Sequence, residues 1–154
     1  MKKVIRISLL VLVAIFIIIQ FIPTGKPSNQ PSPGKDLFEV TEIPQDVGLL
    51  MKNACYDCHS QKVKFPWYSN VAPMSWLVAR DIKEARENLD FSKWGYFSKK
   101  EKLKALDKIG DEVGEKKMPI PMYTLMHAEA RLTQAERDAI VNWAEGLAEK
   151  ILEE

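Results

Sequence analysis

The chain has 154 residues, of which 46% are hydrophobic and 28% are charged, so its composition excludes a disordered or collagen-like protein. Its 22 basic and 21 acidic residues nearly cancel, and three of the basic residues stand at the extreme N-terminus. The remainder is slightly acidic and lacks the basic surface that nucleic-acid binding requires, so we expect no nucleic-acid partner. Two cysteines are too few for a disulfide-rich scaffold.

The N-terminal segment is strongly apolar. Residues 7–22 carry no charge, and a helix over residues 4–22 would be about 28 Å long, close to the roughly 30 Å of a bilayer's hydrocarbon core. The three preceding basic residues would stay in the cytoplasm by the positive-inside rule. We therefore predict that residues 1–22 form a single transmembrane anchor in a bacterial cytoplasmic membrane, with residues 4–22 in the lipid bilayer. The alternative is a cleaved signal peptide, although the apolar run is longer than usual for one.

The next segment has the composition of a linker. Four of the nine prolines lie between Pro23 and Pro33, together with small and polar residues that cannot form a core. We predict a Pro-rich linker over residues 23–36 and a folded domain over residues 37–154. With the anchor in the membrane, this domain would face the periplasm.

Four amphipathic patterns predict helices in the domain, and no segment alternates as a strand would. The first covers about residues 45–60, and the second begins after Pro73. The third and fourth each begin with a capping box, Ser98-x-x-Glu101 and Thr133-x-x-Glu136. Residues 61–72 and 116–130 separate these patterns and contain prolines, so we expect long loops there. The domain is predicted to be all-α.

The chemistry-bearing motif is Cys55-Tyr56-Asp57-Cys58-His59, a C-x-x-C-H sequence that is typical of covalent attachment of c-type haem. Residues three apart lie on one face of a helical turn, so both thiols can reach the two vinyl groups of one porphyrin. His59 then follows as the proximal ligand of the iron. The motif predicts one covalent haem c per chain.

Three other sites fit the same cysteines. A thioredoxin-like redox pair would stand at a helix N-terminus after a strand, and no such strand is expected. A zinc site of two cysteines and two histidines would need His127, the only other histidine. A plain disulfide is the third alternative, since an oxidising compartment would allow it.

Candidates for the sixth iron ligand cluster in one proline-rich loop. We favour Met118 because it directly precedes Pro119, which restricts its backbone to an extended conformation. Met122 and His127 are the alternatives, with Met126 behind them as a core filler. An open sixth position is a further alternative and would suit gas sensing or peroxide chemistry. A thioether ligand would raise the potential of the iron relative to an imidazole.

Aromatic residues follow the motif closely in sequence. Trp67 and Tyr68 are expected either to form a wall of the haem pocket and donate a hydrogen bond to a propionate, or to pack in the core.

The domain resembles the haem-binding-domain family, small bacterial cytochrome-c-like proteins that are often membrane-anchored. The resemblance implies a cytochrome-c-like helical fold with long haem-cradling loops, covalent haem through Cys55 and Cys58, and His59 as axial ligand, and it supports Met118 as the distal ligand. It covers about Val47 to Ala148 and rests on these motifs: Cys55–Ser60, Pro66–Asn70 with Ala72-Pro73 and Ser75-Trp76, Phe91-Ser92-x-Trp94, Met118-Pro119-x-Pro121-x-Tyr123, Leu132-Thr133-x-x-Glu136 and Asn142-Trp143-Ala144.

These features together predict a membrane-tethered monohaem cytochrome that transfers single electrons outside the cytoplasmic membrane. Its partners would be redox proteins at that membrane, and the chain would be an electron carrier rather than an enzyme. The alternative is a haem sensor or a peroxidase-like protein whose sixth ligand exchanges.

Overall fold

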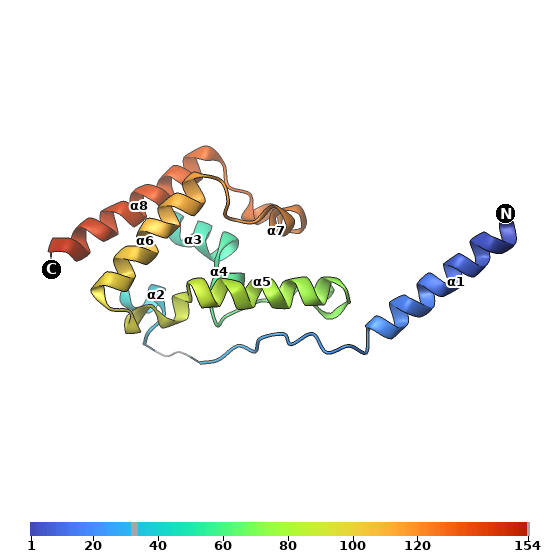
Figure 1. The fold of residues 1–154 in the computed structure, drawn as a ribbon. Helices are drawn as coiled ribbons and strands as arrows, with labels where there is room; N and C mark the ends of the chain where they lie inside the picture. Colours follow the sequence, from blue (N-terminus) through green and yellow to red (C-terminus); the bar gives the residue numbers. More distant parts are fainter. Residues whose placement is uncertain (32–33, 154) are drawn as a thin grey trace.

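The computed structural model describes residues 1–31 and 34–153. All regular elements in these two ranges are helices, and no strand occurs within them, which confirms the all-α prediction. Figure 1 shows one helix, α1 (Lys2–Ile19), standing away from a body that contains the others. The elements of the body are α2 (Leu37–Val40), α3 (Gln45–Ala54), α4 (Tyr56–His59), the 3-10 helix η1 (Trp67–Asn70), α5 (Met74–Asn88), η2 (Phe91–Tyr96), α6 (Lys99–Gly114), α7 (Pro121–Met126), η3 (Ala128–Ala130) and α8 (Gln134–Glu153).

The predicted transmembrane helix is wrong. Across residues 1–31 and 34–153, no helix combines the length and the apolar character needed to cross a membrane. Helix α1 ends at Ile19, three residues earlier than predicted, and its 18 residues include Lys2, Lys3 and Arg6. The bilayer contact over residues 4–22 and the single-pass location with a periplasmic domain, both inferred from that helix, are corrected with it.

The chain between α1 and α2 runs along the body (Figure 1). At the end of α1, the Gln20 side chain donates to the carbonyl of Ala72 over 3.2 Å and accepts from the Ala72 amide over 2.9 Å. Asn29 makes the same reciprocal pair with the backbone of Val63, at 3.0 and 3.1 Å. The extended segment is therefore attached to the domain at both ends of residues 20–29.

The core forms chiefly between α6 and α8, which pack against one another. Buried side chains recur three or four residues apart on both helices: Leu106, Ile109 and Val113 on α6 face Ile140 and Ala144 on α8. This spacing puts the apolar residues of each helix on one stripe, as the sequence predicted.

Both predicted capping boxes are confirmed, and they fix where α6 and α8 begin. The Ser98 amide donates to the Glu101 carboxylate over 2.8 Å, and the Glu101 amide donates back to the Ser98 hydroxyl. Thr133 and Glu136 exchange the same bonds, the first at 2.7 Å. Each pair satisfies amides that the first helical turn leaves without partners.

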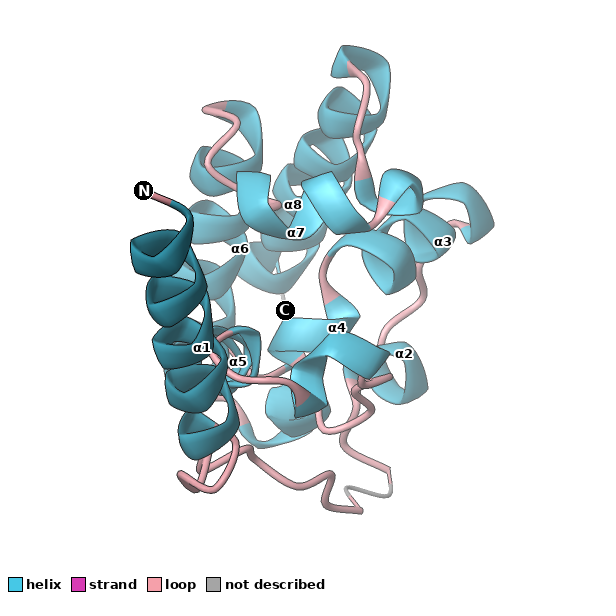
Figure 2. Cartoon of the chain, turned by 90° about the vertical axis from the view of Figure 1, so that its right-hand side faces the viewer, coloured by secondary structure: helices cyan, strands magenta, loops and turns pink. Residues whose placement is uncertain are grey.

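The predicted helix over residues 45–60 is divided in two. Cys55 leaves the helical conformation, with φ of −124°, so α3 ends at Ala54 and α4 begins at Tyr56. Figure 2 shows α4 in the middle of the body, between α5 and α2, with α7 above it. The predicted loop 116–130 also contains the short helix α7, which begins at Pro121. Proline suits this first position because its missing N–H would have no helical partner there.

Candidate functional site

The C-x-x-C-H residues lie on one tight turn. The Cys55 carbonyl accepts hydrogen bonds from the amides of Cys58 and His59, at 3.2 and 2.9 Å. This turn brings the two cysteines and the histidine to one side, where all three line the same cavity.

The two residues inside the motif anchor this turn to its surroundings. The Tyr56 ring stacks on Phe91 with centroids 5.2 Å apart, and its hydroxyl donates to the fully buried Asp36 carboxylate over 3.0 Å. Asp57 accepts from the Tyr123 hydroxyl on α7, also over 3.0 Å. Tyr56 therefore attaches the motif to the core, and Asp57 attaches it to α7, the helix that follows Met118 in the chain.

The cavity has a volume of about 380 Å³. Cys55, Cys58, His59 and Met118 all line it, although Met118 is 59 residues from the histidine in sequence. Most of its other lining residues are apolar: Met51, Ala54, Ala85, Leu89, Phe91, Ile109, Val113, Pro119, Ile120 and Ile140.

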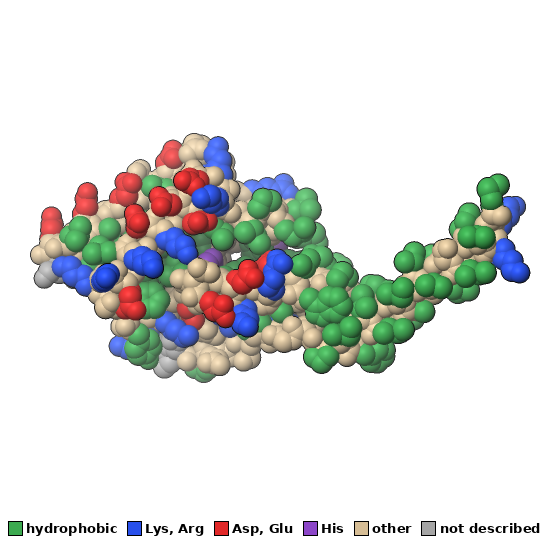
Figure 3. Space-filling model, in the orientation of Figure 1, with side chains coloured by type: hydrophobic (Ala, Val, Ile, Leu, Met, Phe, Trp, Pro, Cys, Tyr) green, Lys and Arg blue, Asp and Glu red, His purple; other side chains and the backbone are tan. Residues whose placement is uncertain are grey.

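The rest of the lining is polar. Asp81, Glu84, Asn88, Lys108, Glu112 and Tyr123 complete the wall, and Glu84, Asn88 and Lys108 among them are exposed to solvent. Figure 3 shows a hollow on this face of the body, bordered by acidic and basic side chains. The cavity is thus apolar inside and polar at its edge.

His59 has a defined orientation and protonation. Its Nδ1–H donates to the backbone carbonyl of Leu89 over 3.0 Å, so Nε2 keeps the lone pair that a metal ion would use. Burial lowers the pKa of His59 below its ordinary value of 6.5, and hydrogen bonding to Leu89 only partly opposes this effect. The imidazole is therefore neutral at neutral pH, the form that binds metal.

Both cysteines are free thiols that burial keeps protonated. Desolvation raises the pKa of each thiol from 9.0 to about 12. They do not form the disulfide that the sequence left open. Residues 1–31 and 34–153 also contain no group of three histidine, cysteine or acidic side chains that could hold a metal ion. The pair follows the helix α3 rather than a strand, so a thioredoxin-like arrangement is absent as well.

Met118 is held from both sides of its peptide unit. Its amide donates to the Glu112 carbonyl at 2.9 Å, and its carbonyl accepts from the Arg137 guanidinium at 2.6 Å. The same guanidinium nitrogen donates to the Val113 carbonyl at 3.0 Å. Arg137 is buried, so these bonds fix Met118 at the cavity wall from the core side.

The other predicted site residues lie elsewhere. Met122 and Tyr68 line a second, smaller cavity, and His127 and Trp67 line neither cavity. The Tyr68 hydroxyl is hydrogen-bonded to Nε2 of His127 at 2.7 Å, and Nδ1–H of that histidine donates to Glu129 over 3.0 Å. The side chain of Trp67 is 74% exposed. Of the candidates for the sixth ligand, Met118 alone is brought to the cavity that contains His59.

Comparison with known families agrees with this geometry. A family model described as a haem-binding domain matches residues 14–146. The chain belongs to the haem-binding-domain family. It is a haem-binding protein, and the matched range of the haem-binding domain includes the motif turn, Met118 and most of α8. No curated protein and no solved structure gives a significant match to the chain.

The cavity of this haem-binding domain suits haem. A porphyrin has a large apolar face and two carboxylates, and the cavity offers an apolar interior with a polar edge that includes Lys108. The lone pair of His59 Nε2 and the sulfur of Met118 are both ligands that haem iron accepts.

Proposed function

We propose that the chain is a monohaem c-type cytochrome that carries single electrons. In this proposal Cys55 and Cys58 bind the haem vinyl groups as thioethers, His59 is the proximal ligand and Met118 is the distal ligand. The observation that carries the proposal is that these four residues, and none of the other ligand candidates, line one cavity. Bound haem would supply an iron that changes oxidation state by one electron.

The residues of the chain would hold the two iron ligands in place while the iron gains or loses an electron. The Leu89 carbonyl accepts from Nδ1–H of His59 and so leaves Nε2 free to bind iron. The Arg137 guanidinium and the Glu112 carbonyl hold the backbone of Met118 in place. The apolar part of the lining would limit the access of water to a bound iron. A rigid site of this kind favours electron transfer because its ligands need little rearrangement. Redox proteins would be the partners.

The mass of the denatured protein tests covalent attachment. The full chain is produced together with a c-type haem maturation machinery, and we expect its mass to exceed that of the polypeptide by one haem. Replacing both thiols, Cys55→Ser with Cys58→Ser, should abolish the increase, and each single replacement should still allow one thioether bond to retain the haem. A parent protein that loses all haem on denaturation would disprove the c-type assignment.

Ligand binding then separates the carrier from the sensor. If Met118 occupies the sixth position, cyanide and carbon monoxide should bind slowly or weakly to the parent protein. Rapid binding of either would favour the haem sensor or peroxidase-like alternative.

A further inference from the structure

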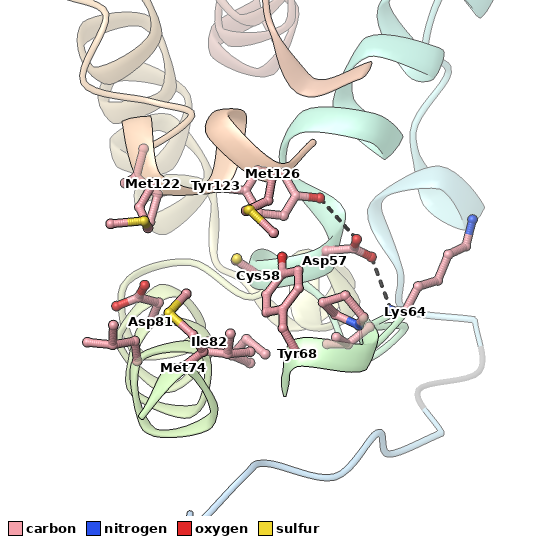
Figure 4. A pocket seen from close by; sticks show the side chains of 15 residues that line it. Asp57, Cys58, Lys64, Tyr68, Met74, Asp81, Ile82, Met122, Tyr123 and Met126 are labelled. Carbon is pink, nitrogen blue, oxygen red and sulfur yellow. Dashed lines mark hydrogen bonds between the residues drawn. The ribbon is translucent and has the colours of Figure 1, made fainter. Parts of the chain in front are cut away.

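The second cavity is lined by three methionines that the proposed haem site does not use. It has a volume of about 50 Å³ and shares Cys58, Asp81, Ile120 and Tyr123 with the first cavity. Met74 at the start of α5 lies on one side of it, and Met122 and Met126 of α7 lie on the other, as Figure 4 shows.

Core packing does not explain Met122 and Met126. Met122 is 51% exposed and Met126 is 49% exposed, whereas a methionine that fills a core gap is buried, as Met51 is at 1%. Met122 and Met126 are four residues apart in α7, so both lie on the helix face that looks toward Met74. Of the six methionines in the chain, three thus line one small cavity.

Each of the two carboxylates that line this cavity already has a partner. Asp57 accepts from the Tyr123 hydroxyl at 3.0 Å and from the Lys64 amide at 3.1 Å, the two interactions drawn in Figure 4. Asp81 is paired with Arg80 at 2.8 Å. Apart from Cys58, which the proposed function assigns to haem, the methionine thioethers are the sulfur ligands that line this cavity, and hard ions such as Mg²⁺ prefer oxygen.

We propose that Met74, Met122 and Met126 form a binding site for a soft monovalent metal ion, Cu(I), beside the haem cavity. Thioether sulfur selects Cu(I) over hard divalent ions. The cavity is larger than the roughly 10–15 Å³ that one water-sized sphere requires. Of the four proposed haem-binding residues, Cys55, His59 and Met118 do not line it, so the ion and the haem iron would occupy separate positions.

Ag(I) is the probe for this site, because it has the same preference for sulfur, and any bound haem is kept in the ferric state so that it has no electron to give to Ag(I). The full chain, with any free thiols alkylated in parent and variants alike, is titrated by calorimetry in chloride-free buffer. We expect one equivalent to bind. Each single variant, Met74→Leu, Met122→Leu or Met126→Leu, should weaken binding about tenfold, and the triple variant should abolish it, because leucine keeps the apolar volume but has no sulfur.

A matched control restores a thioether outside the cavity. Leu125 is on α7 and 67% exposed but does not line the cavity, so Leu125→Met in the triple variant should not restore binding. Unchanged Ag(I) affinity in the triple variant, restoration by Leu125→Met, or no binding to the parent would each overturn the proposal. Haem attachment is read separately from the denatured mass, so failure of the cytochrome assignment would be distinguishable from failure of this one.

Discussion

The Arg137 guanidinium donates a 2.6 Å hydrogen bond to the backbone carbonyl of Met118. The bond joins α8 to a residue that lines the same cavity as His59, and the same nitrogen also donates to the Val113 carbonyl. A buried charged donor with two carbonyl partners is expensive to remove, since both acceptors then lose their bonds. Arg137 therefore connects the stability of the core with the position of Met118.

Replacing Arg137 should loosen Met118 as well as weaken the fold. We expect Arg137→Leu to lower the free energy of unfolding by about 2–3 kcal/mol, because two carbonyls near the core lose a charged donor. In the haem-loaded protein the same change should speed the binding of cyanide to the iron.

The control for this prediction is Arg131→Leu, which removes an exposed guanidinium bonded to the Thr124 carbonyl at 2.9 Å. It should change stability by less than about 1 kcal/mol and leave cyanide binding unaltered. If both variants bind cyanide at the parental rate, Arg137 has only a structural role.

Replacing Met118 tests the distal ligand directly. Met118→Ala should lower the midpoint potential by on the order of 0.1 V and open the iron to carbon monoxide, because a thioether favours the ferrous state. Met122→Ala is the matched control, since Met122 does not line the large cavity, and it should leave both properties unchanged. An unaltered potential in Met118→Ala would show that another group occupies the sixth position.

The pH dependence of the haem-free protein should reveal His59. Its pKa in the folded chain lies below the ordinary value of 6.5 because the ring is buried, so the unfolded chain binds the extra proton first. The stability contributed by a neutral His59 is therefore complete above about pH 7.5 and decreases as the pH falls through 6.5 toward the folded pKa.

Urea unfolding at about pH 7.5 and about pH 5.5 measures this effect. The difference in stability between the two conditions should be smaller in His59→Gln than in the parent. His127 is present in both proteins and cancels from the comparison. Equal differences would mean that His59 does not resist protonation in the folded state.

Two helical glycines should respond to alanine in opposite ways. A Cβ on Gly48 in α3 would meet the Phe38 ring at 2.9 Å, whereas one on Gly110 in α6 would have no neighbour within 4 Å. Gly110→Ala should stabilise the protein by about 0.5–1 kcal/mol through helix propensity. Gly48→Ala should destabilise it by about 1 kcal/mol, since the packed ring must move. Thermal unfolding of both variants checks this, and a stabilising Gly48→Ala would mean that the ring moves freely.

Local sequence signals predicted the helices that have their own start signals. The capping boxes at Ser98 and Thr133 depend on residues three apart, and both helices begin where those boxes indicate. The break at Cys55 has no such signal, since the pattern of apolar residues continues across it. The predicted membrane helix failed because α1 ends at Ile19, so that its 18 residues include Lys2, Lys3 and Arg6. The bonds between Gln20 and Ala72, directly after this end, are not visible in a hydropathy pattern.

The candidate site was predictable only in part, because its motifs are local in the sequence but their hydrogen-bonding partners are distant. The C-x-x-C-H spacing and the position of Met118 before Pro119 are readable from the sequence. The groups that orient them are distant: Leu89 is 30 residues from His59, and Arg137 is 19 residues from Met118. Which residues pair over such distances depends on the tertiary packing and cannot be read from local sequence patterns. Asp36 could have been found, because Asp36-x-x-Glu39 is itself a capping box, although its bond to Tyr56 could not.

The reciprocal bonds of Asn29 with Val63 and of Gln20 with Ala72 have a practical consequence for truncated versions of this protein. A fragment that begins at residue 34 would expose the backbone groups of Val63 and Ala72 that these side chains satisfy. The residues just before η1 and α5 would then lose the hydrogen bonds that attach them to residues 20–29. A fragment that retains residues 20–31 would keep these interactions and is the better starting point for expression and crystallisation.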